Sequence, residues 1–396
     1  MERRDFLKQS TLASSLFFVP SFVKAFESVT QNTFKHKKLV IIQLSGGNDG
    51  LNTIIPYTND VYYRNRPKIA IPKNKLIKAT DELGFHQSLA PLKNLYDQGY
   101  LSIINNVGYR NPNRSHFRST DIWQTASNAD EYLSSGWVGR FIEKYGKNPY
   151  SAIELDDSLS LIMKGEKMNG IATKDPRVLF GNTQTPFFNK VLKQQTEEHL
   201  SEHNLGYLYK TMIEAKSSAK YIYETSKTYK SNFEYPNNPF GKQLKTTAEF
   251  INSDLDSKVY YVSMGGFDTH AYQLNRQEKL LRTYSDAVEV FVNDLKKNDS
   301  FKDTLILTFS EFGRRVQQNA AQGTDHGAAN NIFLIGENLK KKGFYNDTPD
   351  LLNLDENGDL IHTIDFRSVY ATILDKWLQV EDSLVLNKSF SKLDFI

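Results

Sequence analysis

Acidic and histidine side chains gather in three short segments that lie far apart in the chain. The segments are residues 45–50, 265–270 and 310–327. Their five candidate ligands are Asp49, Asp268, His270, Glu311 and His326. Carboxylate oxygens and imidazole nitrogens are the groups with which proteins bind Zn²⁺ and other divalent cations. The residue types therefore predict a divalent metal site, with Zn²⁺ as the first candidate and Mn²⁺ or Ca²⁺ as alternatives.

Each of these segments follows a short apolar run, and the runs are residues 38–44, 258–264 and 304–309. Apolar runs rich in β-branched residues that stop at glycine and acid are typical of buried parallel strands. In open α/β sheets, ligands bind just outside the carboxyl ends of such strands. The sequence therefore predicts that the candidate ligands meet at one edge of a mostly parallel sheet.

Some candidates also have ordinary structural interpretations. Asp49 stands between Asn48 and Gly50, and this combination is equally good turn chemistry. Asp268 and His270 are two residues apart in a loop, where they would serve equally well in capping a helix. His326 is the clearest candidate ligand, because a histidine beside glycine would be unusual as core packing.

Two charged residues follow the third apolar run. Glu311 comes directly after it, and Arg314 lies three residues later. The structural interpretation is a simple salt bridge between them. In the functional interpretation Glu311 binds metal and Arg314 binds an anion, because a guanidinium matches phosphate or sulfate in a bidentate way.

Ser115 stands where residues 101–107, a further predicted strand, lead into a predicted helix over 115–126. A hydroxyl at a helix N-terminus lies in a positive field, which suits a nucleophile that attacks an anionic ester. The alternative is that Ser115 only caps the helix, a common position for serine. Arg114, His116 and Arg118 make this region cationic in either case.

The first residues of the chain indicate export. Arg3 and Arg4 precede Phe-Leu-Lys and an apolar stretch over residues 11–23, which is the order of a bacterial twin-arginine (Tat) signal. We therefore expect a signal peptide over residues 1–25, the Tat translocase as a partner during export, and a periplasmic or extracellular protein without a membrane span. An uncleaved signal would instead remain as an N-terminal anchor.

Composition narrows the possible functions of the remaining chain. The formal net charge is +3, of which residues 1–25 contribute +2, so the rest carries about +1. Because its basic residues are dispersed, nucleic-acid binding is not expected. Cysteine is absent, which excludes disulfides and thiolate metal sites. Strand and helix patterns alternate except over residues 151–238, where a lysine- and tyrosine-rich stretch predicts a helical insertion or cap.

Six motifs occur in an order that strongly resembles the bacterial family called domain of unknown function 1501. They are residues 44–53, 113–117, 265–270, 310–314, 323–327 and 365–370. That family is grouped with the alkaline phosphatase and sulfatase superfamily. The resemblance implies an alkaline-phosphatase-like α/β sandwich over residues 37–396, in which a mostly parallel central sheet is flanked by helices and one or two metals bind at the strand ends.

The resemblance also implies roles for individual residues. A carboxylate follows the first strand (Asp49), a serine nucleophile opens a helix (Ser115), and an Asp/His pair, an acidic residue and a late histidine complete the site. This sequence departs from the pattern because Phe312 follows Glu311 where the superfamily has Asp-His, so one metal position is altered. The absence of a cysteine or serine maturation motif argues against a standard sulfatase.

Together these features predict an exported metal-dependent hydrolase of a phosphate or related ester, acting on a small molecule or a glycan. Ser115 would attack, while Arg114 or Arg314 would hold the non-bridging oxygens. Two alternatives remain open at this stage. One is a non-catalytic protein that binds an anion or glycan, and the other is a structural surface protein.

Overall fold

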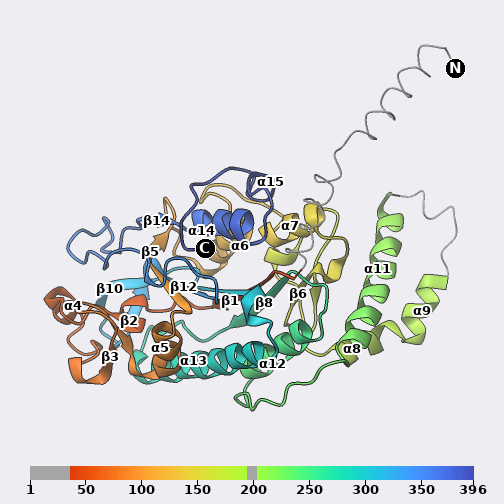
Figure 1. Cartoon of the computed structure of the whole chain (residues 1–396). Coiled ribbons are helices and arrows are strands. Elements are labelled where there is room, and N and C mark those ends of the chain that lie inside the picture. The colour runs from red at the N-terminus through yellow and green to blue at the C-terminus, as the bar shows by residue number, and fades with distance from the viewer. Residues whose placement is uncertain (1–35, 194–202) are drawn as a thin grey trace, which may run out of the picture. The chain divides into compact units, whose positions relative to one another are not determined.

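Strand β1 (Lys38–Leu44) is wholly buried at the centre of the main sheet (Figure 1). It pairs in parallel with β8 (Val259–Met264) and β9 (Thr304–Phe309). The computed structural model describes residues 36–193 and 203–396, so the expected signal peptide lies outside the described residues. The three parallel strands are those predicted from the apolar runs, and their carboxyl ends reach the same edge.

Six further strands complete the main sheet. They are β5 (Leu101–Gly108), β6 (Ala152–Glu154), β7 (Ile171–Ala172), β12 (Asn330–Ile335), β13 (Gly343–Phe344) and β14 (Ile364–Asp365). Their order is β13-β5-β12-β9-β1-β8-β6-β7, with β14 also paired to β5. Within this sheet, β12 is the one described strand that runs antiparallel to both of its neighbours. The predicted mostly parallel α/β sheet is therefore confirmed.

Alternate residues of β1 face two hydrophobic layers, as a buried strand requires. Val40 and Ile42 pack with helices α5 (Ala90–Asp97), α12 (Pro239–Asn252) and α13 (Gln273–Lys297). Leu39 and Ile41 pack with α6 (His116–Thr125), α7 (Trp137–Tyr145) and α14 (Phe366–Thr372). Figure 1 shows these two helical layers below and above the sheet.

The stretch over residues 151–238 is only partly helical. It begins with β6 and β7, which belong to the main sheet, and continues with α8 (Pro176–Thr183), α9 (Pro186–Lys193) and α11 (His203–Thr225). Within the described residues, no helix is both long enough and apolar enough to span a membrane.

The remaining elements are short. Two of them are the helices α3 (Gly50–Thr53) and α4 (Asp60–Asn65). Three strands, β2 (Ile54–Ile55), β4 (Gly84–His86) and β3 (Leu76–Lys78), form a small sheet in that order. Strands β10 (Arg314–Gln318) and β11 (Thr324–His326) form a hairpin. Near the C-terminus a π-helical turn, Ile373–Trp377, continues α14, and α15 (Ser383–Leu386) follows.

A buried carboxyl group in β6 should make stability depend on pH. Glu154 is 2% exposed, and burial raises its pKa to about 7 from an ordinary value of 4.5, although Ser160 donates two hydrogen bonds to it. Between these two pH values the folded chain holds a proton that the unfolded chain has released. The free energy of unfolding should therefore fall by about 3 kcal/mol as pH rises through this window.

Urea denaturation at pH 5 and pH 8 measures this effect. The Glu154→Gln variant should lose this part of the pH dependence, because its amide does not titrate. Equal pH dependence in the variant and the wild type would contradict the assignment to Glu154.

Candidate metal centre

Loops from five elements meet at the carboxyl edge of the main sheet. The loops after β1, β8 and β9 meet there because the three strands are parallel. Strand β5 also points this way, since it is antiparallel to β12 and β12 is antiparallel to β9. Helix α6 begins after β5 with Ser115 as its N-cap residue, and the β10–β11 hairpin begins at Arg314. The topology thus brings together segments more than 200 residues apart.

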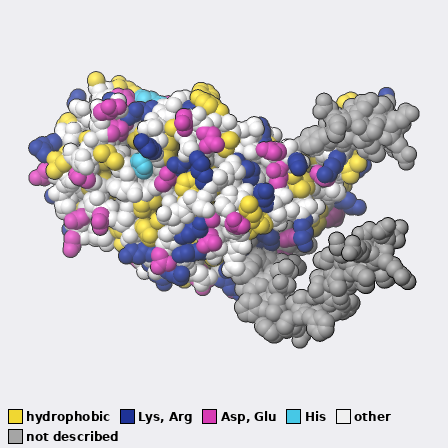
Figure 2. Space-filling view, turned by 90° about the horizontal axis from the view of Figure 1, so that it is seen from above, with side chains coloured by type: hydrophobic (Ala, Val, Ile, Leu, Met, Phe, Trp, Pro, Cys, Tyr) yellow, Lys and Arg dark blue, Asp and Glu magenta, His cyan; other side chains and the backbone are white. Residues whose placement is uncertain are grey.

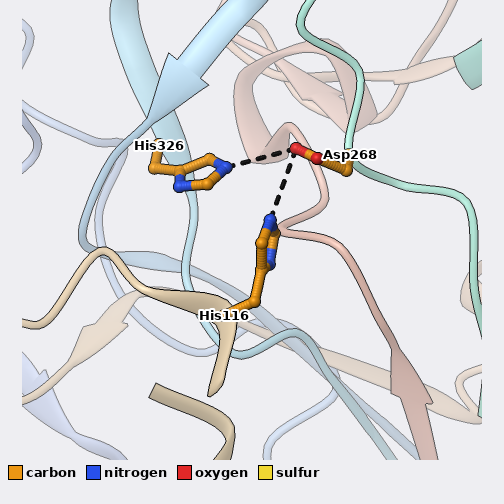
Figure 3. A group of neighbouring side chains, drawn as sticks. All are labelled: His116, Asp268 and His326. Carbon is orange, nitrogen blue, oxygen red and sulfur yellow. Dashed lines mark hydrogen bonds and ion pairs between the residues drawn. The ribbon is translucent and has the colours of Figure 1, made fainter. Parts of the chain in front are cut away.

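Asp268 is surrounded by three imidazole rings. Its Oδ1 lies 3.4 Å from His116 Nε2, 3.0 Å from His270 Nε2 and 3.2 Å from His326 Nε2. Figure 3 shows His116 and His326 directed at this carboxylate from different segments. Ligand atoms of these two histidines and Asp268 all lie within 4.8 Å of one another. We call the four residues the His–Asp cluster.

The hydrogen bonds behind the rings define which nitrogens face the cluster. His326 Nδ1 lies 2.7 Å from the carbonyl oxygen of Arg114, which can only accept, so Nδ1 carries the proton. His116 Nδ1 lies 2.9 Å from Glu311 Oε1, and His270 Nδ1 lies 3.2 Å from Asp325 Oδ1. Each neutral ring therefore directs the lone pair of Nε2 into the cluster. A metal-binding histidine is usually held in this way, by an acceptor at its other nitrogen.

Without a positive charge, this arrangement of nitrogens is unfavourable. The Nε2 atoms of His270 and His326 lie only 2.9 Å apart. Within the described residues, His116 Nε2 is buried and no hydrogen bond reaches it. A proton or a metal cation between the rings would remove the lone-pair repulsion and satisfy the unpaired nitrogen. The donor set of imidazole nitrogens and one carboxylate fits a divalent cation such as Zn²⁺.

The charges within the cluster differ from residue to residue. Burial opposes ionisation of Asp268, but the charge and hydrogen bond of the Arg314 guanidinium favour it, and the pKa of this carboxyl lies well below its usual range. The hydrogen bond to Glu311 raises the pKa of His116, whereas burial lowers the pKa of His326. Asp268 is therefore an anion at neutral pH and available to a cation.

Glu311 does not reach the centre of the cluster. It is 1% exposed, and its Oε1 accepts hydrogen bonds from Gly46 N–H at 2.8 Å and from His116 at 2.9 Å. In the structure this carboxylate orients a candidate ligand from behind.

Asp49 is engaged away from the cluster. Its side chain is fully buried in an ion pair with Arg66, with 2.6 Å between Oδ2 and the guanidinium. It also accepts a hydrogen bond from Gln273 at 2.5 Å and caps α3 through Leu51 N–H. These contacts make Asp49 part of a buried structural ion pair. They do not support the predicted role as a metal ligand, and they are more than a simple turn.

Arg314 joins the loops that carry the site. Its guanidinium donates to the carbonyl oxygens of Gly46, Gly47, Phe267 and Thr324 and to Asp268 Oδ1. The side chain is 0% exposed. Four of its five N–H groups are engaged, so these contacts support a positioning role rather than the predicted binding of substrate oxygens.

The glycine pair after β1 makes this close packing possible. Gly46 has φ +118° and Gly47 has φ +73°, backbone conformations that other residues rarely adopt. A Cβ atom on Gly46 would collide with the backbone of Asp268, and one on Gly47 would collide with the Phe312 ring.

Arg114 and Ser115 lie at the start of α6. The Arg114 guanidinium binds Asp359 and Asp355, with 2.7 Å from Nε to Asp359 Oδ2, while its backbone carbonyl accepts from His326. The sequence analysis predicted that Arg114 would hold substrate oxygens. These contacts instead direct its guanidinium at two carboxylates. Ser115 is exposed and its hydroxyl makes no capping hydrogen bond, so the capping alternative lacks its main support.

His116 was not predicted as a ligand from the sequence. The available signal was its place directly after the candidate nucleophile, at a helix start on the same sheet edge. The sequence showed only a basic, polar segment there, and the distant partners Glu311 and Asp268 become neighbours only through the sheet topology.

Comparison with known families adds an identity to this geometry. The family described as "Protein of unknown function (DUF1501)" matches residues 187–388, slightly more than half of the chain. The chain belongs to this family. The matched part of this DUF1501 protein includes Asp268, His270, Glu311 and His326, whereas His116 precedes it. Among curated proteins, none matches the sequence.

Several solved structures are similar to this DUF1501 chain. The lipoteichoic acid synthase LtaP from Listeria monocytogenes has a TM-score of 0.41 and 8% identity, with 90% of this chain and 77% of that chain covered. The PsFucS1 sulfatase from Pseudoalteromonas sp. has a TM-score of 0.41 and 12% identity, with 94% of this chain and 73% of that chain covered. A protein in the alkaline phosphatase superfamily from Vibrio parahaemolyticus has a TM-score of 0.40 and 10% identity, with 91% of this chain and 72% of that chain covered.

Proposed function

We propose that this DUF1501 protein is an exported metal-dependent hydrolase of a phosphate or related ester. His116, Asp268 and His326 would hold the cation. The observation that carries the proposal is the convergence of bare Nε2 atoms on Asp268, each ring being held at Nδ1 by an acceptor. Export is inferred from the twin-arginine segment at Arg3 and Arg4.

The ligand types favour Zn²⁺ over Ca²⁺, because Ca²⁺ takes oxygen ligands whereas imidazole suits Zn²⁺. Three protein ligands leave a coordination position open, as in catalytic zinc sites. His270 was predicted from the sequence as a ligand. It is the most exposed of the three rings, at 43%, and we assign it to the border of this open position.

Ser115 is the proposed nucleophile. It is an exposed residue that directly precedes His116, and its hydroxyl does not cap the helix. Its oxygen would form a bond to phosphorus while the bond to the leaving alcohol breaks, and the serine proton would pass to that leaving oxygen. Water would then cleave the serine ester and restore the hydroxyl. A bound divalent cation would supply Lewis acidity for the developing negative charge.

Elemental analysis of the purified protein tests the metal site. The wild type should contain near-stoichiometric zinc, and the Asp268→Ala and His326→Ala variants should lose most of it. His362→Ala should keep it, because His362 lies outside the cluster. A metal-free wild type whose thermal stability is unchanged by chelation and metal re-addition would refute the proposal.

The Ser115→Ala variant tests the reaction separately. It should retain the metal and lose turnover in a screen of phosphate and sulfate esters. Metal binding without turnover of any ester by the wild type would leave a non-catalytic binding protein instead.

A further inference from the structure

We propose that the site prefers a phosphodiester, which carries a single negative charge, with an aromatic or other apolar group beside the scissile bond. This inference rests on the proposed function and narrows its substrate class. It follows from two independent observations, the balance of charges around the His–Asp cluster and the exposed aromatic side chains that adjoin its residues in the chain.

With one bound divalent cation, the charges at the cluster would be balanced before a substrate binds. Asp268, Glu311 and Asp325 supply three carboxylates, each within 3.4 Å of a ring nitrogen of the cluster. Among the described residues, Arg314 provides the one guanidinium in contact with the cluster. This arginine and one divalent cation together balance the three carboxylates. Arg314 is also buried beneath the loops, so it has little capacity to bind a substrate.

The two arginines that adjoin the site residues in the chain, Arg114 and Arg315, are balanced as well. Arg114 contacts Asp359 and Asp355, and Arg315 Nε lies 3.6 Å from Asp359 Oδ1. Two cations are thus held by two carboxylates. Neither the cluster with Arg314 nor the pair Arg114 and Arg315 has the excess positive charge that a dianionic phosphate monoester would need. A monoanionic diester brings one negative charge less into a site rich in carboxylates.

Two strongly exposed aromatic side chains adjoin the cluster in the chain. Phe117 directly follows His116 and is 87% exposed, and Tyr272, two residues after His270, is 74% exposed. Tyr272 also has φ +47°, an uncommon conformation for a bulky residue, and its N–H donates to the carbonyl of Ala321 at 3.0 Å. An aromatic ring held in solvent on a strained backbone gains nothing from core packing, so contact with a ligand is the function we assign to it.

A further apolar group, Phe312, lies directly against the cluster. The Phe312 ring is buried against His116 and His326, with centroid distances of 4.9 and 4.6 Å. Leu352 and Ile361, which precede and follow in sequence the turn that holds Arg114, are exposed. Figure 2 shows histidine side chains reaching the surface on a face that also carries hydrophobic side chains. An apolar ester substituent could pack against such a surface.

Binding measurements test the inference without relying on turnover. Calorimetry on the zinc-loaded Ser115→Ala protein should show diphenyl phosphate binding about 10-fold more tightly than phenyl phosphate. Phe117→Ala and Tyr272→Ala should each weaken diphenyl phosphate binding by about 5-fold with unchanged zinc content. Phe187→Ala, which removes an equally exposed ring on α9, is the matched control and should bind like its parent.

Kinetics on the wild type give the second test. The kcat/KM for bis(4-nitrophenyl) phosphate should exceed that for 4-nitrophenyl phosphate by about 10-fold, and the two aromatic variants should raise KM more than they lower kcat. Tighter binding or faster turnover of the monoester would overturn the inference, as would aromatic variants that bind diphenyl phosphate like the wild type. Tight, ring-dependent diphenyl phosphate binding without any turnover would refute only the proposed hydrolase.

Discussion

Replacing His116 with alanine should weaken zinc binding by more than about 100-fold, because losing even an outer-shell partner of a metal ligand typically costs 10–100-fold. His116 Nε2 is buried, lies 3.4 Å from Asp268 Oδ1 and has no hydrogen-bond partner among the described residues. Removing the ring deletes one of three proposed ligands. Competition with a chromophoric chelator measures the affinity, and elemental analysis after dialysis measures the zinc that remains.

Two further variants calibrate this result. Glu311→Gln keeps the ring of His116 but weakens the acceptor behind it, so affinity should fall by about 10–100-fold. His362→Ala removes a histidine outside the cluster and should leave affinity unchanged. If His116→Ala bound zinc as tightly as His362→Ala, His116 would not be a ligand, and the cluster would have to bind metal through His270 or bind none.

The central strands of the fold could be predicted because their side chains are buried on both faces. Such strands appear as nearly continuous apolar runs, and β1, β8 and β9 were all identified in this way. Strands β6 and β7 have only three and two residues, too few for a pattern. Strand order was also beyond reach, because it depends on pairing between distant segments, as between β12 and β5.

The site was only partly predictable for a related reason. Asp268, His270 and His326 were identified from residue type and position, and the structure brings them together. For Asp49 the sequence could not distinguish a metal ligand from a buried ion pair, since the deciding partner, Arg66, lies in another segment. His116 was missed because its relation to the cluster comes entirely from tertiary structure.

Replacing Arg314 with methionine should lower the free energy of unfolding by about 3–5 kcal/mol. The buried guanidinium donates to carbonyls in the loops after β1 and β8 and in the β10–β11 hairpin, and to Asp268. Methionine fills a similar volume but leaves these buried carbonyls without their donor. Urea denaturation of the metal-free protein measures this loss apart from any stabilisation by zinc.

Arg314→Lys and Arg315→Met separate the possible causes of that loss. A lysine ammonium keeps the charge but cannot reproduce the planar set of donors, so we expect most of the destabilisation to remain. Arg315 is 39% exposed, and its replacement should cost about 1 kcal/mol or less. Arg314→Met should also weaken zinc binding, because Asp268 would lose the hydrogen bond of 2.7 Å that favours its ionised form. Wild-type stability in Arg314→Met would show that these loops are held together by other contacts.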